Sequence, residues 1–239
     1  MKFKLFLPFF LLLFSNLIGQ VEVTQGLEFA NTSNSFMNRI VQGDENSIYT
    51  YRVKTKGGGF SYFIEKYDKE TMKLLFLKEI KYEQNQNINV EDVFYSSGNV
   101  YVFISHFYKE KNTMSLSYSA ITSVGEIVSE NAELWTVPSS DREMVDFELF
   151  LSPEKNKFLV KVSYAISENE SYKTEFVLYE TKSMKQIYKK QVDKNLSSKV
   201  FIRTTASSKV PVKNPDFHKL LLDEQDNIYY VYSTKKNGE

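Results

Sequence analysis

Four stretches of the chain repeat one pattern of apolar and polar positions. Each has a short apolar stretch, a polar turn that contains an asparagine, and a dense run of apolar and aromatic residues. The dense runs are residues 48–51, 100–104, 158–162 and 228–232. A short apolar run bounded by turn residues is typical of a strand that is covered on both faces. The pattern therefore predicts a β unit that occurs four times.

An asparagine stands one or two residues before each dense run. The four are Asn46, Asn99, Asn156 and Asn227. Because asparagine tolerates a positive φ, it closes hairpin turns well. We expect these residues to adopt that backbone conformation.

A second marker recurs with nearly the same spacing. Residues 67–75 resemble residues 179–187, and residues 120–128 lie between them at offsets of 53 and 59. The leading residues of the dense runs are 52, 58 and 70 residues apart, so two markers agree on one repeat. Gly125 occupies the place of Met72 and Met184.

A fourth strand is predicted in each unit, at residues 74–80, 126–134 and 186–192. The apolar spacing around Met72 also fits a short helix, and this alternative stays open. Gly125 and the β-branched residues that follow it favour a strand.

These units predict an all-β fold, a β-propeller-like array of four-stranded blades. The most apolar strands are second in each unit and the most polar are fourth, which is the order expected of blades with their outer edge in water. The expected units are residues 36–82, 90–136, 145–193 and a partial unit 217–239, with an inserted linker at 196–215. We expect an incomplete ring that self-associates through its open edge; the alternative is a four-bladed ring closed by strands at residues 21–23 and 27–29.

Two segments carry a family resemblance. Residues 97–102 read SGNVYV and residues 63–68 read FIEKYD, and both are similar to repeats of bacterial secreted β-propellers of the NHL and SBBP type. The resemblance extends over about three and a half units, residues 36–239. It implies a propeller and little about activity, since propellers include both binding proteins and enzymes.

The N-terminus has the features of a secretory signal peptide. Lys2 and Lys4 precede an apolar run at residues 5–14, and a more polar segment ends at Gly19. A transmembrane anchor would need about 20 apolar residues. We expect cleavage after Gly19, a mature domain at residues 20–239 without a stable membrane anchor, and a secreted or periplasmic location.

Composition narrows the chemistry. The chain has 239 residues, 30 basic and 30 acidic side chains, two histidines and no cysteine. Cysteine-based catalysis and thiolate zinc sites are therefore excluded. A nucleic-acid partner is not expected, because the charges balance. The sequence assigns no catalytic, metal-binding or cofactor-binding residue, and no cofactor.

Several side chains are candidates for chemistry, and a structural role is favoured for each. His106 and His218 have no recognisable catalytic partners. The acidic residues Asp141, Glu143, Asp146 and Glu148 fit a solvated strand face better than a glycosidase or calcium site. Residues 56–59 form a hairpin loop and not a phosphate cradle. Trp135 and the tyrosines are expected to pack between blades and not to line a sugar-binding face.

One segment is strongly basic. Residues 182–219 contain ten basic and two acidic side chains. The favoured interpretation is that the lysines keep exposed strand edges soluble; the alternative is an anionic partner, such as a polysaccharide or a cell-surface phosphate. The candidate patch is Lys189, Lys190, Lys194, Lys199, Arg203, Lys209 and Lys213.

The sequence thus predicts an exported binding or scaffolding module that recognises a protein or a polysaccharide. The alternative is the propeller portion of a secreted hydrolase, whose active site lies elsewhere or beyond Glu239.

Overall fold

The computed structural model describes residues 34–56, 59–82, 87–140, 145–166, 171–192, 218–223, 225 and 227–232. The chain divides into a unit of residues 1–30 and a unit of residues 31–239, and all described residues belong to the second. The predicted signal peptide, the predicted strands at 21–23 and 27–29 and the linker at 196–215 lie outside the described residues.

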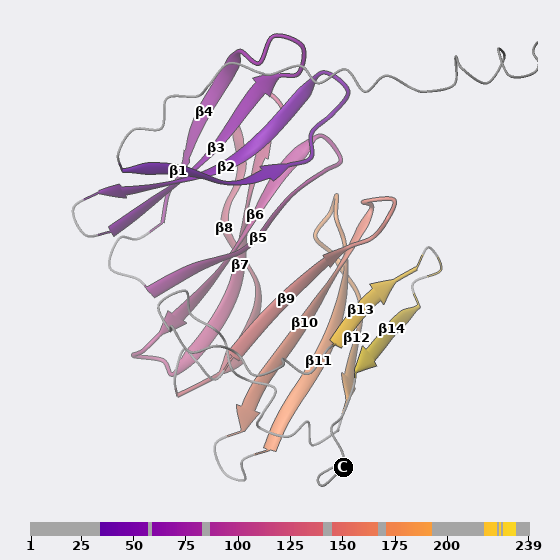
Figure 1. Ribbon diagram of the computed structural model, residues 1–239. Helices are drawn as coiled ribbons and strands as arrows, with labels where there is room; N and C mark the ends of the chain where they lie inside the picture. The colour runs from indigo at the N-terminus through magenta and orange to yellow at the C-terminus, as the bar shows by residue number, and fades with distance from the viewer. Residues whose placement is uncertain are drawn as a thin grey trace, which may run out of the picture. The chain divides into compact units, whose positions relative to one another are not determined.

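The described residues form three four-stranded antiparallel sheets and a two-stranded hairpin (Figure 1). The first sheet contains β1 (Ser35–Val41), β2 (Ser47–Lys56), β3 (Gly59–Asp68) and β4 (Leu74–Ile80). The second contains β5 (Asn87–Ser96), β6 (Asn99–Tyr108), β7 (Thr113–Thr122) and β8 (Ile127–Pro138). The third contains β9 (Val145–Leu151), β10 (Lys157–Ile166), β11 (Ser171–Glu180) and β12 (Gln186–Val192). The hairpin contains β13 (His218–Leu222) and β14 (Ile228–Tyr232).

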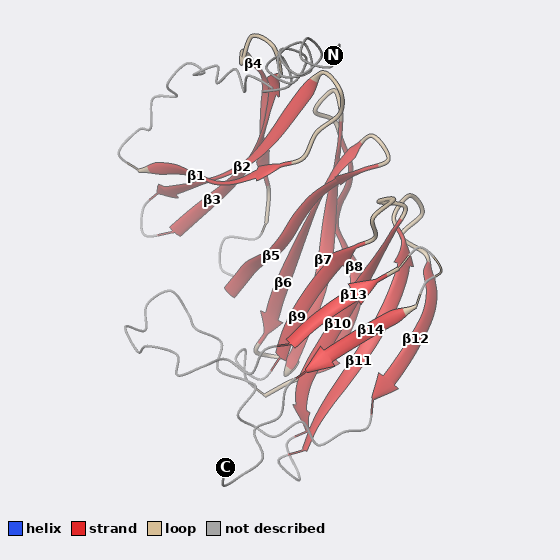
Figure 2. Ribbon diagram, turned by 45° about the vertical axis from the view of Figure 1, so that its right-hand side comes forward, coloured by secondary structure: helices blue, strands red, loops and turns tan. Residues whose placement is uncertain are grey.

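Strand order within each sheet follows chain order, so each sheet is a simple meander. The described part of the chain contains strands and no helix (Figure 2), and thus no helix long and apolar enough to cross a membrane. The all-β, propeller-like fold is therefore confirmed. The helical alternative around Met72 is wrong, because β4 begins at Leu74, directly after the turn.

Burial follows the predicted gradient across each sheet. On β6, residues 100–106 are all buried, whereas most residues of β12 are exposed. A strand flanked by two others, with a further sheet on each face, has no route to water, and an outer strand has one free edge. This gradient explains why the second strands are the most apolar.

Successive sheets pack on one another through apolar faces. Val41, Tyr49, Tyr51, Val53 and Ile64 of the first sheet meet Val93, Val100, Val102, Ile104 and Ile121 of the second. The opposite face of the second sheet, with Phe94, Tyr101, Phe103, Met114 and Leu116, meets Phe158, Val160, Val162, Val177 and Tyr179 of the third. Leu159, Phe176 and Leu178 on the far face of the third sheet meet Leu222 of the hairpin. The second and third sheets therefore each contribute their two faces to two different interfaces, as blades of a propeller do.

Hydrogen bonds also join the sheets. Lys66 Nζ of the first sheet donates to the carbonyl of Ser123 in the second, at 2.9 Å. Tyr179 of the third sheet donates its hydroxyl to the carbonyl of Leu134 in the second, at 3.1 Å. Both bonds lie toward the outer strands, so they supplement the apolar contact where it is weakest.

The turn before each outer strand has the same backbone conformation in all three sheets. Met72 has a φ of 54°, Gly125 of 85° and Met184 of 55°. In the first and third sheets the methionine N–H donates to the carbonyl four residues earlier, that of Asp68 and of Glu180, at 2.9 Å. The equivalence of these three positions, predicted from the sequence, is thus visible in the backbone.

The expected positive φ at the four asparagines is wrong. The left-handed residues of these turns come earlier: Ser97 and Gly98 in the second sheet, and Lys155 in the third. Asn46 and Asn156 instead offer their backbone carbonyls to the N–H groups of the next hairpin turn, those of Lys69 and Thr181, each at 2.9 Å. These bonds connect two turns at the same end of one sheet.

The fourth unit consists of two strands in the described part of the chain. Within the described residues the sheets form an open array and not a closed ring. The segments that could close it, residues 21–23 and 27–29, lie outside the described residues.

Candidate ligand pocket on the inner strands

The first strands of the four units lie next to one another. β5 contacts both β1 and β9, and β9 contacts β13. Between them is a pocket of about 480 Å³. It is lined by Arg39, Ile40, Val41, Gln42, Asp92, Val93, Phe94, Tyr95, Leu149, Phe150, Leu151, Pro153 and Leu222. All four units therefore contribute to one site.

A charged residue occupies the same register position on each inner strand. Arg39 pairs with Tyr51, Asp92 with Phe103, Glu148 with Lys161 and Lys219 with Val231. The four partner residues are 52, 58 and 70 residues apart, which are the spacings of the repeat. The inner strands thus carry a basic, an acidic, an acidic and a basic residue in order.

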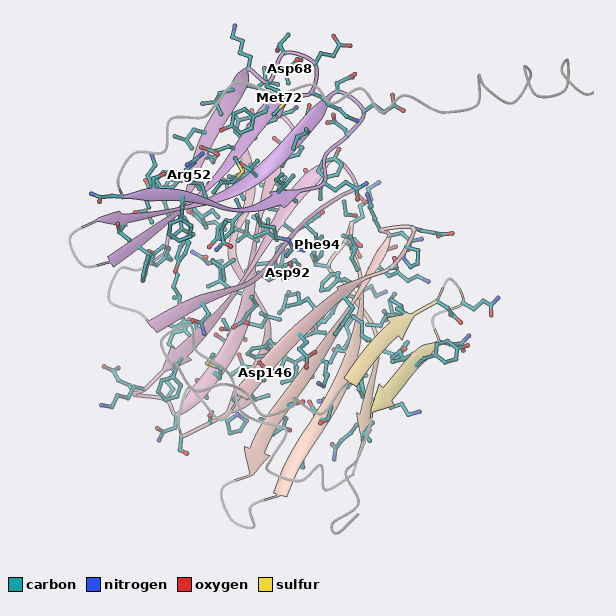
Figure 3. All side chains as sticks on the ribbon, in the orientation of Figure 1. Arg52, Asp68, Met72, Asp92, Phe94 and Asp146 are labelled. Carbon is teal, nitrogen blue, oxygen red and sulfur yellow. The ribbon has the colours of Figure 1, made fainter. Side chains whose placement is uncertain are left out.

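The first two of these charges form an ion pair in the pocket. The guanidinium of Arg39 donates to Oδ1 of Asp92, which also accepts the N–H of Val93 at 2.7 Å. The Arg39 side chain is 55% exposed and that of Asp92 only 19%. The carboxylate is therefore the more buried member of the pair and the guanidinium the more exposed one (Figure 3 labels Asp92 and Phe94 on β5).

A β-bulge precedes each member of this pair. The β1–β2 register shifts between Met37 and Arg39, and the β5–β6 register shifts between Val90 and Asp92. A bulge adds one residue to a strand and changes the direction of the side chain that follows. Equivalent bulges on neighbouring inner strands position the two charges.

Burial raises the pKa of Asp92, and the nearby Arg39 charge and the Val93 N–H oppose the shift. Desolvation is the largest of these effects. The Asp92 carboxylate is therefore poorly hydrated, and a ligand that donates a hydrogen bond to it displaces little water.

Glu148 differs from its prediction. Its side chain is 25% exposed and forms an ion pair with Lys161 of β10, which is 5% exposed. The expectation that Glu148 belongs to a solvated face is wrong, because the buried ammonium of Lys161 requires a counter-ion. Asp146 also lies on β9, whereas Asp141 and Glu143 lie outside the described residues.

The described residues contain no group of three or more histidine, aspartate or glutamate side chains that could hold a metal ion. His106 is buried on β6 with its ring 3.9 Å from that of Tyr108. His218 begins β13, and its side chain lies outside the description.

The structure describes two residues of the predicted basic patch. Lys189 and Lys190 lie on the outer strand β12. Lys189 pairs with Glu175 at 2.8 Å, and its Nζ lies 4.2 Å from the centre of the Trp135 ring. The other five, Lys194, Lys199, Arg203, Lys209 and Lys213, lie outside the described residues, so the patch stays a prediction. Trp135 packs between the second and third sheets and does not line the pocket.

Comparison with known proteins finds similarity among solved structures and none among family models or curated proteins. Among solved structures the chain is similar to the endo-arabinase from Bacteroides thetaiotaomicron VPI-5482, with 11% identity and a TM-score of 0.43. The alignment covers 80% of this chain and 68% of that one. The sheets and their interfaces themselves define the chain as propeller-like.

Proposed function

We propose that the protein is an exported binding module of the β-propeller type and that its ligand site is the pocket on the inner strands. The lining of the pocket brings together residues from all four units. Placement at the convergence of repeated units suits a ligand site, because small differences between the units supply different groups to one cavity.

The Arg39–Asp92 pair is the observation that carries this proposal. An ion pair in the lining of a concave, largely apolar site is the kind of polar feature that orients a ligand. Both side chains keep hydrogen-bonding capacity beyond their mutual bond, since a guanidinium has five donors and a carboxylate several acceptor sites.

Binding is favoured over catalysis at this site. Glycoside hydrolysis uses two carboxyl groups on either side of the bond that is cleaved. The described lining residues include one carboxylate, Asp92, which is engaged by Arg39. In the alternative, the chain is part of a secreted hydrolase that carries out its chemistry elsewhere.

Export is a separate part of the proposal and rests on residues 1–19. It predicts that protein recovered from the cell envelope or the culture medium begins at Gln20, as determined by N-terminal sequencing and intact mass. Protein that remains in the cytoplasm and retains residues 1–19 would contradict it.

Binding is tested on the mature chain, residues 20–239, by thermal-shift and calorimetric titration with panels of soluble oligosaccharides and peptides. Ile40→Trp, at an exposed position of the lining, should fill the pocket and abolish binding. Val124→Trp is the matched control, because Val124 is equally exposed but does not line the pocket. Binding that survives Ile40→Trp would contradict the assignment of the site, and release of shorter products from a bound oligosaccharide would favour the hydrolase.

A further inference from the structure

We infer that the pocket takes an uncharged, hydroxyl-rich ligand, a neutral carbohydrate, which Arg39 and Asp92 recognise together. The inference rests on the proposed function and specifies its ligand class. It follows from the Arg39–Asp92 ion pair in the lining and from the composition of the remaining lining.

The charges that line the pocket are already matched. Arg39 and Asp92 neutralise each other, and Glu148, the next charged residue in the inner-strand series, does not line the pocket. Glu148 in turn is paired with Lys161. A charged ligand would have to compete with one member of an existing pair and leave the other member partly buried without its partner, which is unfavourable.

A hydroxyl group avoids this penalty, because it donates and accepts at the same time. It can donate to the Asp92 carboxylate and accept from the Arg39 guanidinium while their ion pair stays intact. Neighbouring hydroxyls of a sugar ring fit two adjacent groups of opposite character. Gln42, also in the lining, carries an amide that both donates and accepts.

The rest of the lining is mainly apolar. It includes Ile40, Leu149, Leu151, Pro153 and Leu222. A sugar ring presents C–H groups on its faces and hydroxyls around its edge, so one face can cover these side chains while the edge reaches the ion pair. An inorganic anion or a fully polar ion has no apolar surface that could pack against these side chains.

The bulges before Arg39 and Asp92 support a recognition role for the pair. A regular strand pairing would suffice if the two charges only stabilised the sheet contact. Irregularities at the same position on two neighbouring inner strands are instead typical of side chains that are redirected toward a site.

The test is calorimetric titration of residues 20–239 with three classes of probe: neutral oligosaccharides of glucose, xylose, arabinose and mannose, anionic oligogalacturonate, and cationic chitosan oligomers. Neutral probes should bind, and their Kd should change by less than about twofold between 0.05 and 0.5 M salt, since no charge is neutralised. The binding should be lost in Ile40→Trp and retained in Val124→Trp.

Arg39→Gln and Asp92→Asn should each weaken binding of the neutral probe about tenfold or more, because each removes a charge-assisted hydrogen bond. The double exchange of Arg39→Asp with Asp92→Arg keeps a pair in the pocket and should recover part of the loss. Circular dichroism and the Tm of each variant check that the fold is retained.

The outcomes separate the two proposals. If a charged probe binds at the Ile40→Trp-sensitive site and neutral probes do not, the ligand class is wrong and the binding function stands. Neutral binding that is unaffected by Arg39→Gln and Asp92→Asn also overturns the inference. If no probe or peptide of any class binds, the proposed function itself fails.

Discussion

Arg39 on β1 and Asp92 on β5 occupy the same register position on neighbouring inner strands, and their side chains form an ion pair across the contact between the first two sheets. The pair connects the repeat to the pocket. One register position on the inner strand of each unit carries a charged residue, and the packing of the sheets brings the first two of these residues together.

Asp92→Asn is expected to remove a pH dependence from the free energy of unfolding. Burial holds the pKa of Asp92 in the folded protein above its value in the unfolded chain. Between these two values the folded state binds the proton and the unfolded chain does not, so this contribution to stability is lost as the pH rises through the interval. The stability of the wild type relative to the variant should therefore decrease from about pH 4 up to the raised pKa and then stay constant. Urea unfolding followed by circular dichroism from pH 3 to 8 measures it.

Asp68→Asn is the control with the opposite sign. Asp68 lies in the exposed turn before Met72 (Figure 3) and accepts hydrogen bonds from the hydroxyl and N–H of Thr71, which hold its pKa below the usual value. Its contribution is present above the unfolded pKa and is lost as the pH falls through the folded one. If the two variants show pH slopes of the same sign, burial is not the dominant effect at Asp92.

Gly125→Ala should destabilise the fold more than Gly98→Ala. Both glycines have a positive φ, 85° and 83°, so both substitutions introduce the same backbone strain. A methyl group at Gly125 would also lie 3.3 Å from ring atoms of Phe76, whereas nothing lies within 4 Å of one at Gly98. We expect about 1 kcal/mol of strain at each site, and about 1 kcal/mol more at Gly125 from the contact. Equal losses of free energy of unfolding would show that Phe76 moves freely and that the first two sheets are loosely packed there.

The outward face of the first sheet carries a buried polar cluster. Arg52 Nε donates to Glu65 at 2.6 Å, Thr50 donates to the same carboxylate at 2.8 Å, and both charged side chains are 7% exposed. Positions equivalent to Arg52 carry Ile104 and Val162, which pack against the preceding sheet. No sheet precedes the first one among the described residues, so the first sheet carries a charge at the position where the other two sheets carry an apolar contact residue.

Glu65→Gln should therefore destabilise the protein strongly, by about 3 kcal/mol, because it leaves the Arg52 charge buried without its counter-ion. Arg52→Leu combined with Glu65→Leu should be less harmful than Glu65→Gln, since the double variant leaves no buried charge without a counter-ion. Chemical denaturation of the single and double variants gives the comparison. A double variant that is less stable than either single variant would mean that the pair is essential for the fold.

Trp135 reports on the contact between the second and third sheets, because it is the only tryptophan of the chain. Its indole N–H is buried without a hydrogen-bond partner among the described residues, and Lys189 lies over the ring while it pairs with Glu175. Lys189→Met should change the emission of Trp135 and lower the free energy of unfolding by about 1–3 kcal/mol, through loss of the cation–π contact and of the Glu175 counter-ion.

Lys190→Met is the matched control, since Lys190 is the exposed neighbour on the same strand. It should leave the emission unchanged and the free energy of unfolding within about 0.5 kcal/mol. If both variants behave alike, Lys189 is a free surface lysine and available to the predicted anionic partner.

Local patterns in the sequence predict the strands well. The bounds of β4 and β12 are the predicted ones, because a turn with a left-handed residue precedes each strand and the alternation after it is regular. The recurrence of the asparagines does not reflect a positive φ, and the carbonyls of Asn46 and Asn156 instead accept hydrogen bonds from a neighbouring turn. Such a bond joins residues more than twenty positions apart and leaves no local signal.

The sequence does not predict the pocket, because the pocket depends on which residues the strand pairing brings into the same register. Arg39 and Asp92 stand directly before the apolar stretches of their units, and Lys219 does so in the fourth, so the repeated charge is readable in the sequence. Glu148 lies close in sequence to other acidic residues, which hides its correspondence to Arg39, Asp92 and Lys219. Only the strand pairing shows that the four positions correspond, and only the packing of the sheets brings Arg39 to Asp92.

The convergence of the inner strands on one pocket is the central claim, and cross-linking tests it most directly, because the chain contains no cysteine. Ile40→Cys combined with Leu151→Cys places two thiols in the lining of the same pocket, on the first and third inner strands. A short bismaleimide should join them within one chain, and the product should run as a monomer with a shifted peptide map. Ile40→Cys combined with Val124→Cys, at a site outside the pocket, should not be joined. Failure of the first pair to cross-link, or equal yields for both pairs, would contradict the account.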